Sequence, residues 1–160
     1  MENNKYVKLH SLLRMFAALL VIAVFISMFV SKMVFDETGE AGRAYVFPGA
    51  FFGEDATLTK GNVLGFVGYI LVLLGGLAGL AFVFIDEMIG KDLTKTLSFV
   101  AGGLIVFGGL AILLFSPLFK DINGLSNDYY TGAAPIVFGI LAVVAGACNV
   151  AAPILEDKGY

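Results

Sequence analysis

The side chains best suited to chemistry in this sequence are carboxylates that occur in pairs. Asp86 and Glu87 are adjacent, and Asp92 follows a short distance along the chain. Paired carboxylates can bind a divalent cation or act as general acid and base. Further acids flank one long polar segment, and they are Asp36, Glu37, Glu40, Glu54 and Asp55. Because neighbouring acids in polar loops are usually just hydrated, we predict no metal site, no catalytic site and no enzymatic activity.

Other reactive side chains are too few to form a familiar kind of site. Cys148 is the only cysteine, which excludes an intrachain disulfide and a cysteine metal centre. His10 is the only histidine, so histidine metal sites and Ser-His-Asp chemistry are not expected. The run LLGGLAGLA lacks the Lys-Ser/Thr pair of a phosphate-binding loop, and we predict no cofactor. A net charge of −3 without a basic stripe argues against nucleic acid as a partner.

The elements that carry these residues are long apolar blocks. The sequence is 59% hydrophobic and 14% charged, whereas soluble domains carry roughly 25% charged residues. Each block is close to the length of about 20 helical residues that crosses a bilayer. The blocks cover residues 12–34, 63–85, 97–119 and 132–155. We therefore predict an all-α integral membrane protein in which residues 1–160 form a single domain, a bundle of four transmembrane helices.

The first block follows Lys5 and Lys8, an arrangement that also describes a secretory signal peptide. Its apolar run of about 20 residues is longer than the 7–15 of a signal peptide, and no A-x-A cleavage site follows, so we expect a retained span. Arg14 and Lys32 mark its two ends, where long cationic side chains can reach the lipid headgroups. Deeper positions of the blocks hold no charged residue, which argues against a proton-coupled pump or an ion-coupled transporter.

The distribution of positive charge predicts the orientation of the spans. An even number of spans places both termini on one side of the cell membrane. That side carries six cations against four on the other, so the positive-inside rule favours cytoplasmic termini. The six are Lys5, Lys8, Arg14, Lys91, Lys95 and Lys158, and the four are Lys32, Arg43, Lys60 and Lys120.

The first outer loop, residues 35–62, is the longest segment outside the spans. Within it, AYVFPGAFF joins two short aromatic, β-prone pieces at Pro48-Gly49, a strong turn signal. We predict a partly extended or hairpin-like segment lying over the outer end of the bundle. Its aromatic side chains either cover the helix ends or form a contact for a partner. These candidate contact residues are Tyr45, Phe47, Phe51 and Phe52.

Small residues recur at helical spacing in the second, third and fourth blocks. The clearest case is GAAPIVFGILAVVAGACNVAAP, residues 132–153. In lipid, helices associate through close van der Waals contact, which small side chains permit. We predict that these faces pack helix against helix, and that Asn149 forms a hydrogen bond across the bundle; homodimerisation through one face is the alternative. The predicted packing residues are Gly68, Gly75, Gly79, Ser98, Gly102, Gly109, Gly139, Ala142, Gly146 and Asn149.

Three segments carry a resemblance to a known group of proteins. They are the loop motif YVFPGAFFG, the glycine-rich LGFVGYILVLLGGL and the final GAAPIVFGILAVVAGA, and a basic N-terminus precedes them. With these features the chain resembles uncharacterised four-span membrane proteins of low-GC Gram-positive bacteria, a resemblance that implies no activity. A long first outer loop and a short second one are also similar to the topology of claudins. The claudin Trp-Gly-Leu-Trp run and loop cysteine pair are missing, so no junction function is implied.

These features favour a non-catalytic membrane protein with a structural or interaction role. It would be a subunit of a membrane complex or a self-associating bundle, with the bilayer and a second copy or another membrane protein as partners. The alternative is a transport or channel component that binds a neutral or lipid-like ligand between its helices. That alternative requires a cavity lined by polar residues of the spans, such as Asn149, Ser98, Ser116 or Tyr69.

Overall fold

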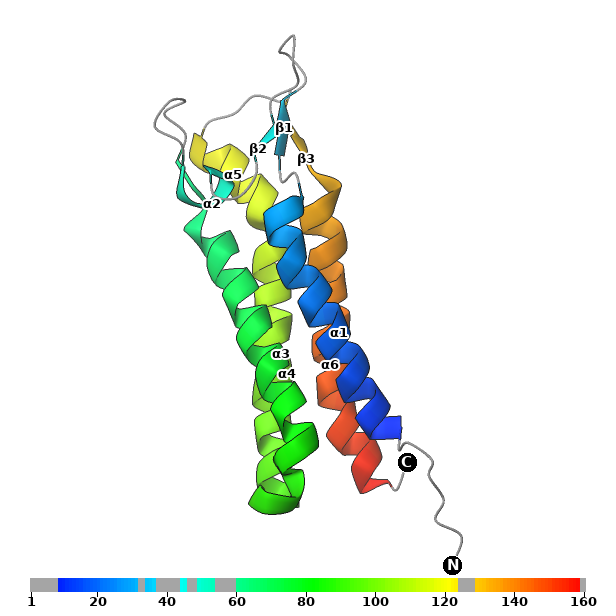
Figure 1. The fold of residues 1–160 in the computed structure, drawn as a ribbon. Helices are drawn as coiled ribbons and strands as arrows, with labels where there is room; N and C mark the ends of the chain where they lie inside the picture. Colours follow the sequence, from blue (N-terminus) through cyan, green and yellow to red (C-terminus); the bar gives the residue numbers. More distant parts are fainter. Residues whose placement is uncertain are drawn as a thin grey trace, which may run out of the picture.

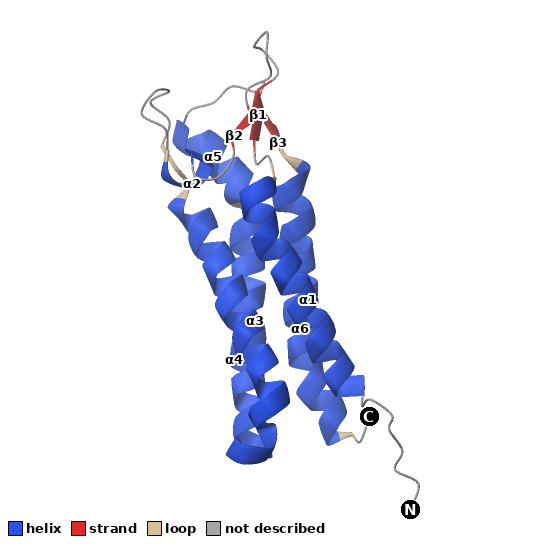
Figure 2. Ribbon diagram, in the orientation of Figure 1, coloured by secondary structure: helices blue, strands red, loops and turns tan. Residues whose placement is uncertain are grey.

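Long helices account for most of the described structure. The computed structural model describes residues 9–31, 34–36, 44–45, 49–53, 60–123 and 129–158. In chain order the elements are α1 (Leu9–Val30), β1 (Val34–Asp36), β2 (Ala44–Tyr45), α2 (Gly49–Phe52), α3 (Val63–Ile89), α4 (Lys91–Leu113), α5 (Phe115–Asn123), β3 (Tyr129–Thr131) and α6 (Ala133–Asp157). The strands are confined to one end of the molecule, and the predicted all-helical fold is confirmed (Figure 2).

Helices α1, α3, α4 and α6 pack as a four-helix bundle (Figure 1). The contacts of α4 with α3 and with α6 are the most extensive, those of α1 with α6 follow, and the α1–α3 contact is the smallest. Each helix is antiparallel to both of its neighbours in this ring. We call the end where α1 begins and α6 finishes the terminal end, and the opposite end, which carries the strands, the loop end.

Each bundle helix is long and apolar enough to cross a membrane. The candidate spans are Leu9–Val30, Val63–Phe82, Asp92–Leu113 and Ala133–Asp157. Only 33–39% of each span is buried inside the protein, so most of its residues face outward. Large aliphatic and aromatic side chains are exposed along all four helices. In water this surface would be unfavourable, whereas lipid solvates it. The chain is therefore a multi-pass membrane protein that contacts the lipid bilayer.

The helix boundaries differ from the predicted spans, most clearly in the first and third spans. The first helix covers Leu9–Val30 instead of residues 12–34, so it begins a turn earlier. The predicted third span, residues 97–119, is divided into α4 and α5 at Leu114. Pro117 explains the division, because a proline has no N–H to donate to the carbonyl four residues earlier, here that of Leu113. Helix α5 then turns across the loop end of the bundle (Figure 1).

The strands at the loop end form a small antiparallel sheet in the order β2-β1-β3. Val34 of β1 lies opposite Tyr45 of β2 on one side and Thr131 of β3 on the other. The sheet therefore joins the loop between α1 and α3 to the loop between α5 and α6. The predicted partly extended, hairpin-like loop is present as the antiparallel β1–β2 pair, but the turn predicted at Pro48-Gly49 is wrong, because helix α2 begins at Gly49. Pro48 itself lies outside the described residues.

Two asparagines fasten the short helices to the bundle. Asn62 is buried, donates to the carbonyl of Phe115 over 2.9 Å and accepts from the amide of Gly65 over 3.3 Å. The backbone N–H of Asn62 donates to the carbonyl of Ala50 over 3.1 Å. Asn62 thus connects α2, α3 and α5. Similarly, Asn123 at the end of α5 accepts from the amide of Lys60 over 2.6 Å and donates to its carbonyl over 2.9 Å.

Candidate functional site: the polar end of the bundle

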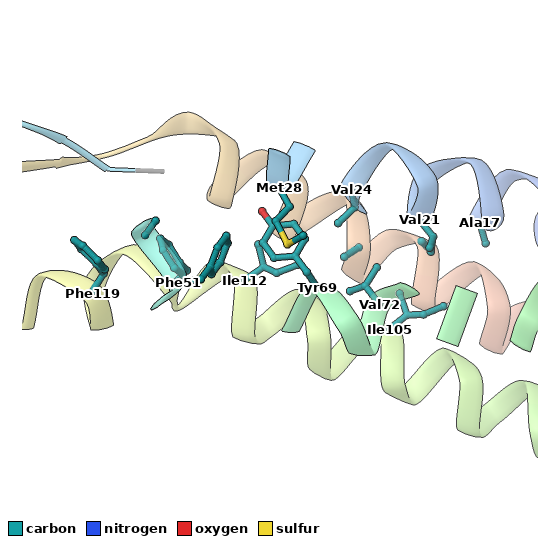
Figure 3. Close-up of a cluster of buried hydrophobic side chains, with 14 residues drawn as sticks. Ala17, Val21, Val24, Met28, Phe51, Tyr69, Val72, Ile105, Ile112 and Phe119 are labelled. Atoms are coloured by element: carbon teal, nitrogen blue, oxygen red, sulfur yellow. The ribbon is translucent and has the colours of Figure 1, made fainter. Parts of the chain in front are cut away.

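Buried polar and charged side chains of the described residues lie toward both ends of the bundle, with Ser27, Asn62 and Ser116 toward the loop end and five others toward the terminal end. A continuous cluster of buried apolar side chains extends from Phe119 along the bundle axis to Ala17 (Figure 3). Beyond it, buried polar side chains gather in the terminal third of the bundle. We call this set the polar interior; its members are His10, Arg14, Thr94, Ser98 and Asn149. Ionisable and hydrogen-bonding groups inside a membrane domain are costly to bury and often mark function. This set is the candidate site.

Arg14 is the most unusual member of the polar interior. It lies five residues after the start of α1, on the same buried face as His10, Ala17 and Val21, and only 2% of its surface is exposed. Its Nη2 donates to Oε2 of Glu156 over 3.3 Å, while its Nε has no hydrogen-bond partner. The expectation that Arg14 reaches the headgroups is therefore wrong, because the earlier start of α1 places it within the bundle. Lys32, the other expected boundary residue, lies outside the described residues.

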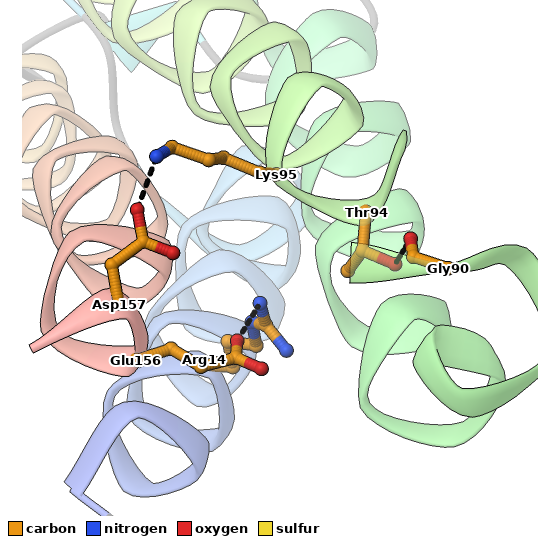
Figure 4. A network of polar contacts seen from close by, with 6 residues as sticks. All are labelled: Arg14, Gly90, Thr94, Lys95, Glu156 and Asp157. Atoms are coloured by element: carbon orange, nitrogen blue, oxygen red, sulfur yellow. Dashed lines mark hydrogen bonds and ion pairs between the residues drawn. The ribbon is translucent and has the colours of Figure 1, made fainter. Parts of the chain in front are cut away.

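A second ion pair lies beside the first. Lys95 of α4 donates to Asp157, which follows Glu156 in the last turn of α6 (Figure 4). Both partners of this pair are exposed to solvent, unlike Arg14. Consecutive acids of α6 thus hold α1 on one side and α4 on the other. Such an exposed pair contributes only about 0–1 kcal/mol, so the Arg14 pair is the one with functional interest.

The uncharged members of the polar interior differ in how their hydrogen bonds are satisfied. The hydroxyl of Thr94 donates over 3.0 Å to the carbonyl of Gly90, four residues earlier in the chain. The hydroxyl oxygen of Ser98 is buried and has no partner. Asn149 donates over 3.5 Å to Ala145 on its own helix, so the predicted hydrogen bond across the bundle is wrong. Its Oδ1 instead faces the space where a side chain on Gly79 would lie.

A proline adds to the polar character of this region. Pro153 is buried inside α6 and has no N–H, so the carbonyl of Asn149, four residues earlier, lacks its usual intrahelical donor. The terminal third of the bundle therefore combines an ion pair, two side-chain donors without acceptors and one interrupted backbone hydrogen bond.

The ten predicted packing residues are all buried between helices. Three glycine pairs approach backbone to backbone: Gly68 with Gly108 between α3 and α4, and Gly102 with Gly146 and Gly109 with Gly139 between α4 and α6. A Cβ added to any of these six glycines would lie within 3.1 Å of the partner's carbonyl oxygen.

The remaining predicted packing residues have other neighbours. Gly75 packs against Ala101 and Ile105, Gly79 against Asn149, and Ala142 against Gly109. The sequence prediction omits Gly108. The doublet Gly108-Gly109 is the signal that could have found it, since adjacent residues on one helix face two different neighbours.

The predicted partner-contact residues separate into different environments. Phe51 is fully buried among Phe66, Tyr69 and Phe115, with ring centroids 5.0–6.1 Å apart. It belongs to the core and offers no surface to a partner, so this part of the prediction is corrected. Phe52 is 54% exposed and contacts Phe66.

The other two predicted contact residues are less fully described. Tyr45 lies in β2, where its backbone pairs with Val34, and Phe47 lies outside the described residues. Of the four predicted contact residues, Phe52 is therefore the one whose side chain is both described and exposed.

The acidic residues singled out from the sequence are distributed over several elements. Asp86 and Glu87 belong to the last turns of α3 and not to a loop, and Asp92 lies in the first turn of α4. Asp36 ends β1, while Glu37, Glu40, Glu54 and Asp55 lie outside the described residues. Among the residues that the structure describes, no group of three His, Cys, Asp or Glu side chains is placed to hold a metal ion.

Comparison with known proteins adds no family to this geometry. No protein-family model matches the chain, and no curated protein matches it. Functional inference therefore depends on the arrangement of the residues themselves.

Proposed function

We propose that this four-span membrane protein is a non-catalytic structural or interaction protein, either a subunit of a membrane complex or a self-associating bundle. The supporting observation is the division between its packing faces and its outer surface. The glycine faces are occupied by the chain's own helices, and the outer surface carries exposed side chains such as Leu19, Phe84 and Phe107. A partner would therefore contact the aliphatic outer surface or the loop end, where Phe52 is exposed.

Mass measurement of the intact chain in mild detergent tests this function. A self-associating bundle gives a mass above that of one 17.0 kDa chain, and a subunit retains a defined partner after purification and in-cell cross-linking. A strictly monomeric species without a partner in both measurements would contradict the proposal.

We also propose that the protein resides in the cell membrane with both termini in the cytoplasm. The support is the excess of cations predicted at the terminal end, to which Arg14, Lys95 and Lys158 contribute. The similarity to four-span proteins of low-GC Gram-positive bacteria is likewise a proposal, supported by the sequence segments alone.

A second function has a specific observation in its favour: binding of a ligand between the helices, as in a transport or channel component. Of the four residues predicted to line such a site, Tyr69 and Ser116 lie near the apolar core at the loop end. Ser98 and Asn149 lie in the polar interior, and the Ser98 hydroxyl has no partner. This division favours a site at the terminal end.

A further inference from the structure

Two hydrogen-bond donors in the polar interior have no acceptor. They are Nε of Arg14 and the hydroxyl of Ser98, and the two residues are only 2% and 1% exposed. Buried polar groups in native structures nearly always have partners, and exceptions call for a missing water, ion or ligand. Both groups can donate a hydrogen bond, so a single acceptor within reach of both would satisfy them.

Contacts with α6 place both groups in the terminal third of the bundle. On α4, Ser98 lies between Lys95, which pairs with Asp157, and Gly102, which packs against Gly146 and Val150. On α1, Arg14 pairs with Glu156. Both buried side chains therefore face the interior opposite the last two turns of α6. They belong to α1 and α4, the helices on either side of α6.

The guanidinium of Arg14 is only partly used by its carboxylate partner. One terminal nitrogen, Nη2, contacts Glu156, which leaves Nε, the other donor of the same edge, unused. Arginine binds phosphate through two parallel N–H donors, and a serine hydroxyl can donate to a further phosphate oxygen. Arg14 lies five residues into α1, about 7–8 Å from its start at 1.5 Å per residue. Arg14 therefore lies near the terminal end of the bundle, within the first two turns of α1.

We propose that Arg14 and Ser98 bind a phosphate group, from a lipid headgroup or from free phosphate, and that Glu156 is its internal competitor. The proposal deepens the second function above and does not depend on oligomeric state. Glu156 can leave the interior because its side chain is 22% exposed, whereas Arg14 cannot. A phosphate monoanion that replaces the carboxylate keeps the guanidinium paired.

Lipid titrations of the full chain in dodecyl maltoside micelles test the site. Phosphatidylglycerol supplies a lipid phosphate, diacylglycerol has the same tails without phosphate, and sodium phosphate supplies the free ion. Binding is followed by native mass spectrometry and by the shift in thermal unfolding temperature. We expect phosphatidylglycerol to bind and stabilise the protein more than diacylglycerol does. Stabilisation by sodium phosphate alone would identify the free ion as the ligand.

Adjacent acids of α6 provide matched variants. Glu156→Gln removes the competitor and should tighten phosphatidylglycerol binding about 10-fold or more, because the partly buried pair with Arg14 no longer has to be broken. Asp157→Asn removes the neighbouring pair, which does not involve Arg14, and should leave binding unchanged. Arg14→Gln should weaken binding about 10-fold or more, because hydrogen bonds to charged groups are lost. Ser98→Ala should weaken it by a smaller factor.

Several results would overturn the proposal. Equal binding of phosphatidylglycerol and diacylglycerol, together with no effect of sodium phosphate, would show that the two donors hold water only. Equal affinities of Glu156→Gln and Asp157→Asn would exclude competition at Arg14. This comparison remains decisive if Arg14→Gln does not fold, because neither acid is required to bind the phosphate. The oligomeric mass measured for the proposed function is a separate readout.

Discussion

Gly102 of α4 and Gly146 of α6 meet backbone to backbone. A Cβ on Gly102 would lie 2.9 Å from the carbonyl oxygen of Gly146, and a Cβ on Gly146 would lie 2.8 Å from that of Gly102. Real Cβ atoms essentially never approach a backbone oxygen this closely, so a side chain on either residue would separate the helices. In lipid, where apolar burial contributes little to helix association, this loss of close packing affects stability directly.

Gly102→Ala should therefore destabilise the bundle by about 1–3 kcal/mol, the usual cost of overpacking. The next residue provides the control, because a Cβ on Gly103 would meet nothing within 4 Å. Gly103→Ala should be neutral or stabilising by up to about 1 kcal/mol through helix propensity. Thermal unfolding in mild detergent, followed by circular dichroism, measures both. Equal stability of the two variants would contradict the described packing of α4 on α6.

Adjacent phenylalanines at the loop end should respond in opposite ways. Phe51 is fully buried, so Phe51→Ala should cost about 3–5 kcal/mol, as for other buried aromatic side chains. Phe52→Ala removes an exposed ring and should change stability by less than about 1 kcal/mol. Loss of a co-purified partner in Phe52→Ala, with unchanged unfolding, would support a contact role for Phe52. A large destabilisation by Phe52→Ala would contradict the placement of α2.

Asn62 should contribute more to the stability of the protein than its position in a loop suggests. Asn62→Ala removes the acceptor for the Gly65 amide and the donor to the Phe115 carbonyl, so we expect a loss of about 1–3 kcal/mol. Asn62→Asp keeps the acceptor at the start of α3 but places an oxygen against the Phe115 carbonyl, and it should not restore stability. Amide hydrogen exchange at Gly65 separates the two effects, since only Asn62→Ala should accelerate it locally. Wild-type stability of Asn62→Asp would show that the contact to α5 contributes nothing.

The proposed orientation predicts different labelling at the two ends of the bundle. In a Cys148→Ala background, Lys60→Cys reports the loop end and Lys158→Cys the terminal end, and both positions are exposed. A membrane-impermeant maleimide should label Lys60→Cys in intact cells and Lys158→Cys only after lysis. The reverse pattern would invert the orientation, and labelling of both variants in intact cells would contradict the four-span topology.

Local sequence pattern accounts for the spans but not for the loop end. The four apolar blocks predict the bundle because length and hydropathy are properties of contiguous residues. Pro48-Gly49 predicts a local hairpin, yet β1 pairs with β3, which lies almost 100 residues further along the chain. Pairing between distant strands leaves no mark in either segment alone. The helical break before Pro117 could have been predicted, because proline has no N–H to continue the helical hydrogen bonds and its ring clashes with the preceding turn.

The candidate site shows the same limit. From the sequence, Asn149 is the candidate polar residue inside spans that otherwise lack charge. The central residue of the site is instead Arg14, which the sequence analysis assigns to a membrane boundary. Its burial depends on Glu156, 142 positions away, and on the start of α1 at Leu9. The spacing of Arg14 could have indicated its burial. At intervals of three and four residues, it lies on one side of the helix with His10, Ala17 and Val21, which are part of the buried face of α1.

The two acids at the end of α6 should affect stability unequally. Glu156→Gln leaves the guanidinium of Arg14 buried without its counter-ion, whereas Asp157→Asn leaves Lys95 free to be hydrated. Removing one partner of a buried pair costs about 3–5 kcal/mol, and we expect roughly 2–3 kcal/mol here because Glu156 is itself partly exposed. Asp157→Asn should cost at most about 1 kcal/mol.

Unfolding of the two variants in lipid-free detergent, at low and at high salt, measures this difference. High salt screens exposed charges but barely affects buried ones, so the Asp157→Asn effect should vanish while the Glu156→Gln effect persists. The double variant Arg14→Leu/Glu156→Leu should recover most of the stability, since an apolar pair of similar volume removes the desolvation cost of the buried charge. If it instead remains as unstable as Glu156→Gln, the destabilisation arises from lost packing at the terminal end and not from an unpaired arginine.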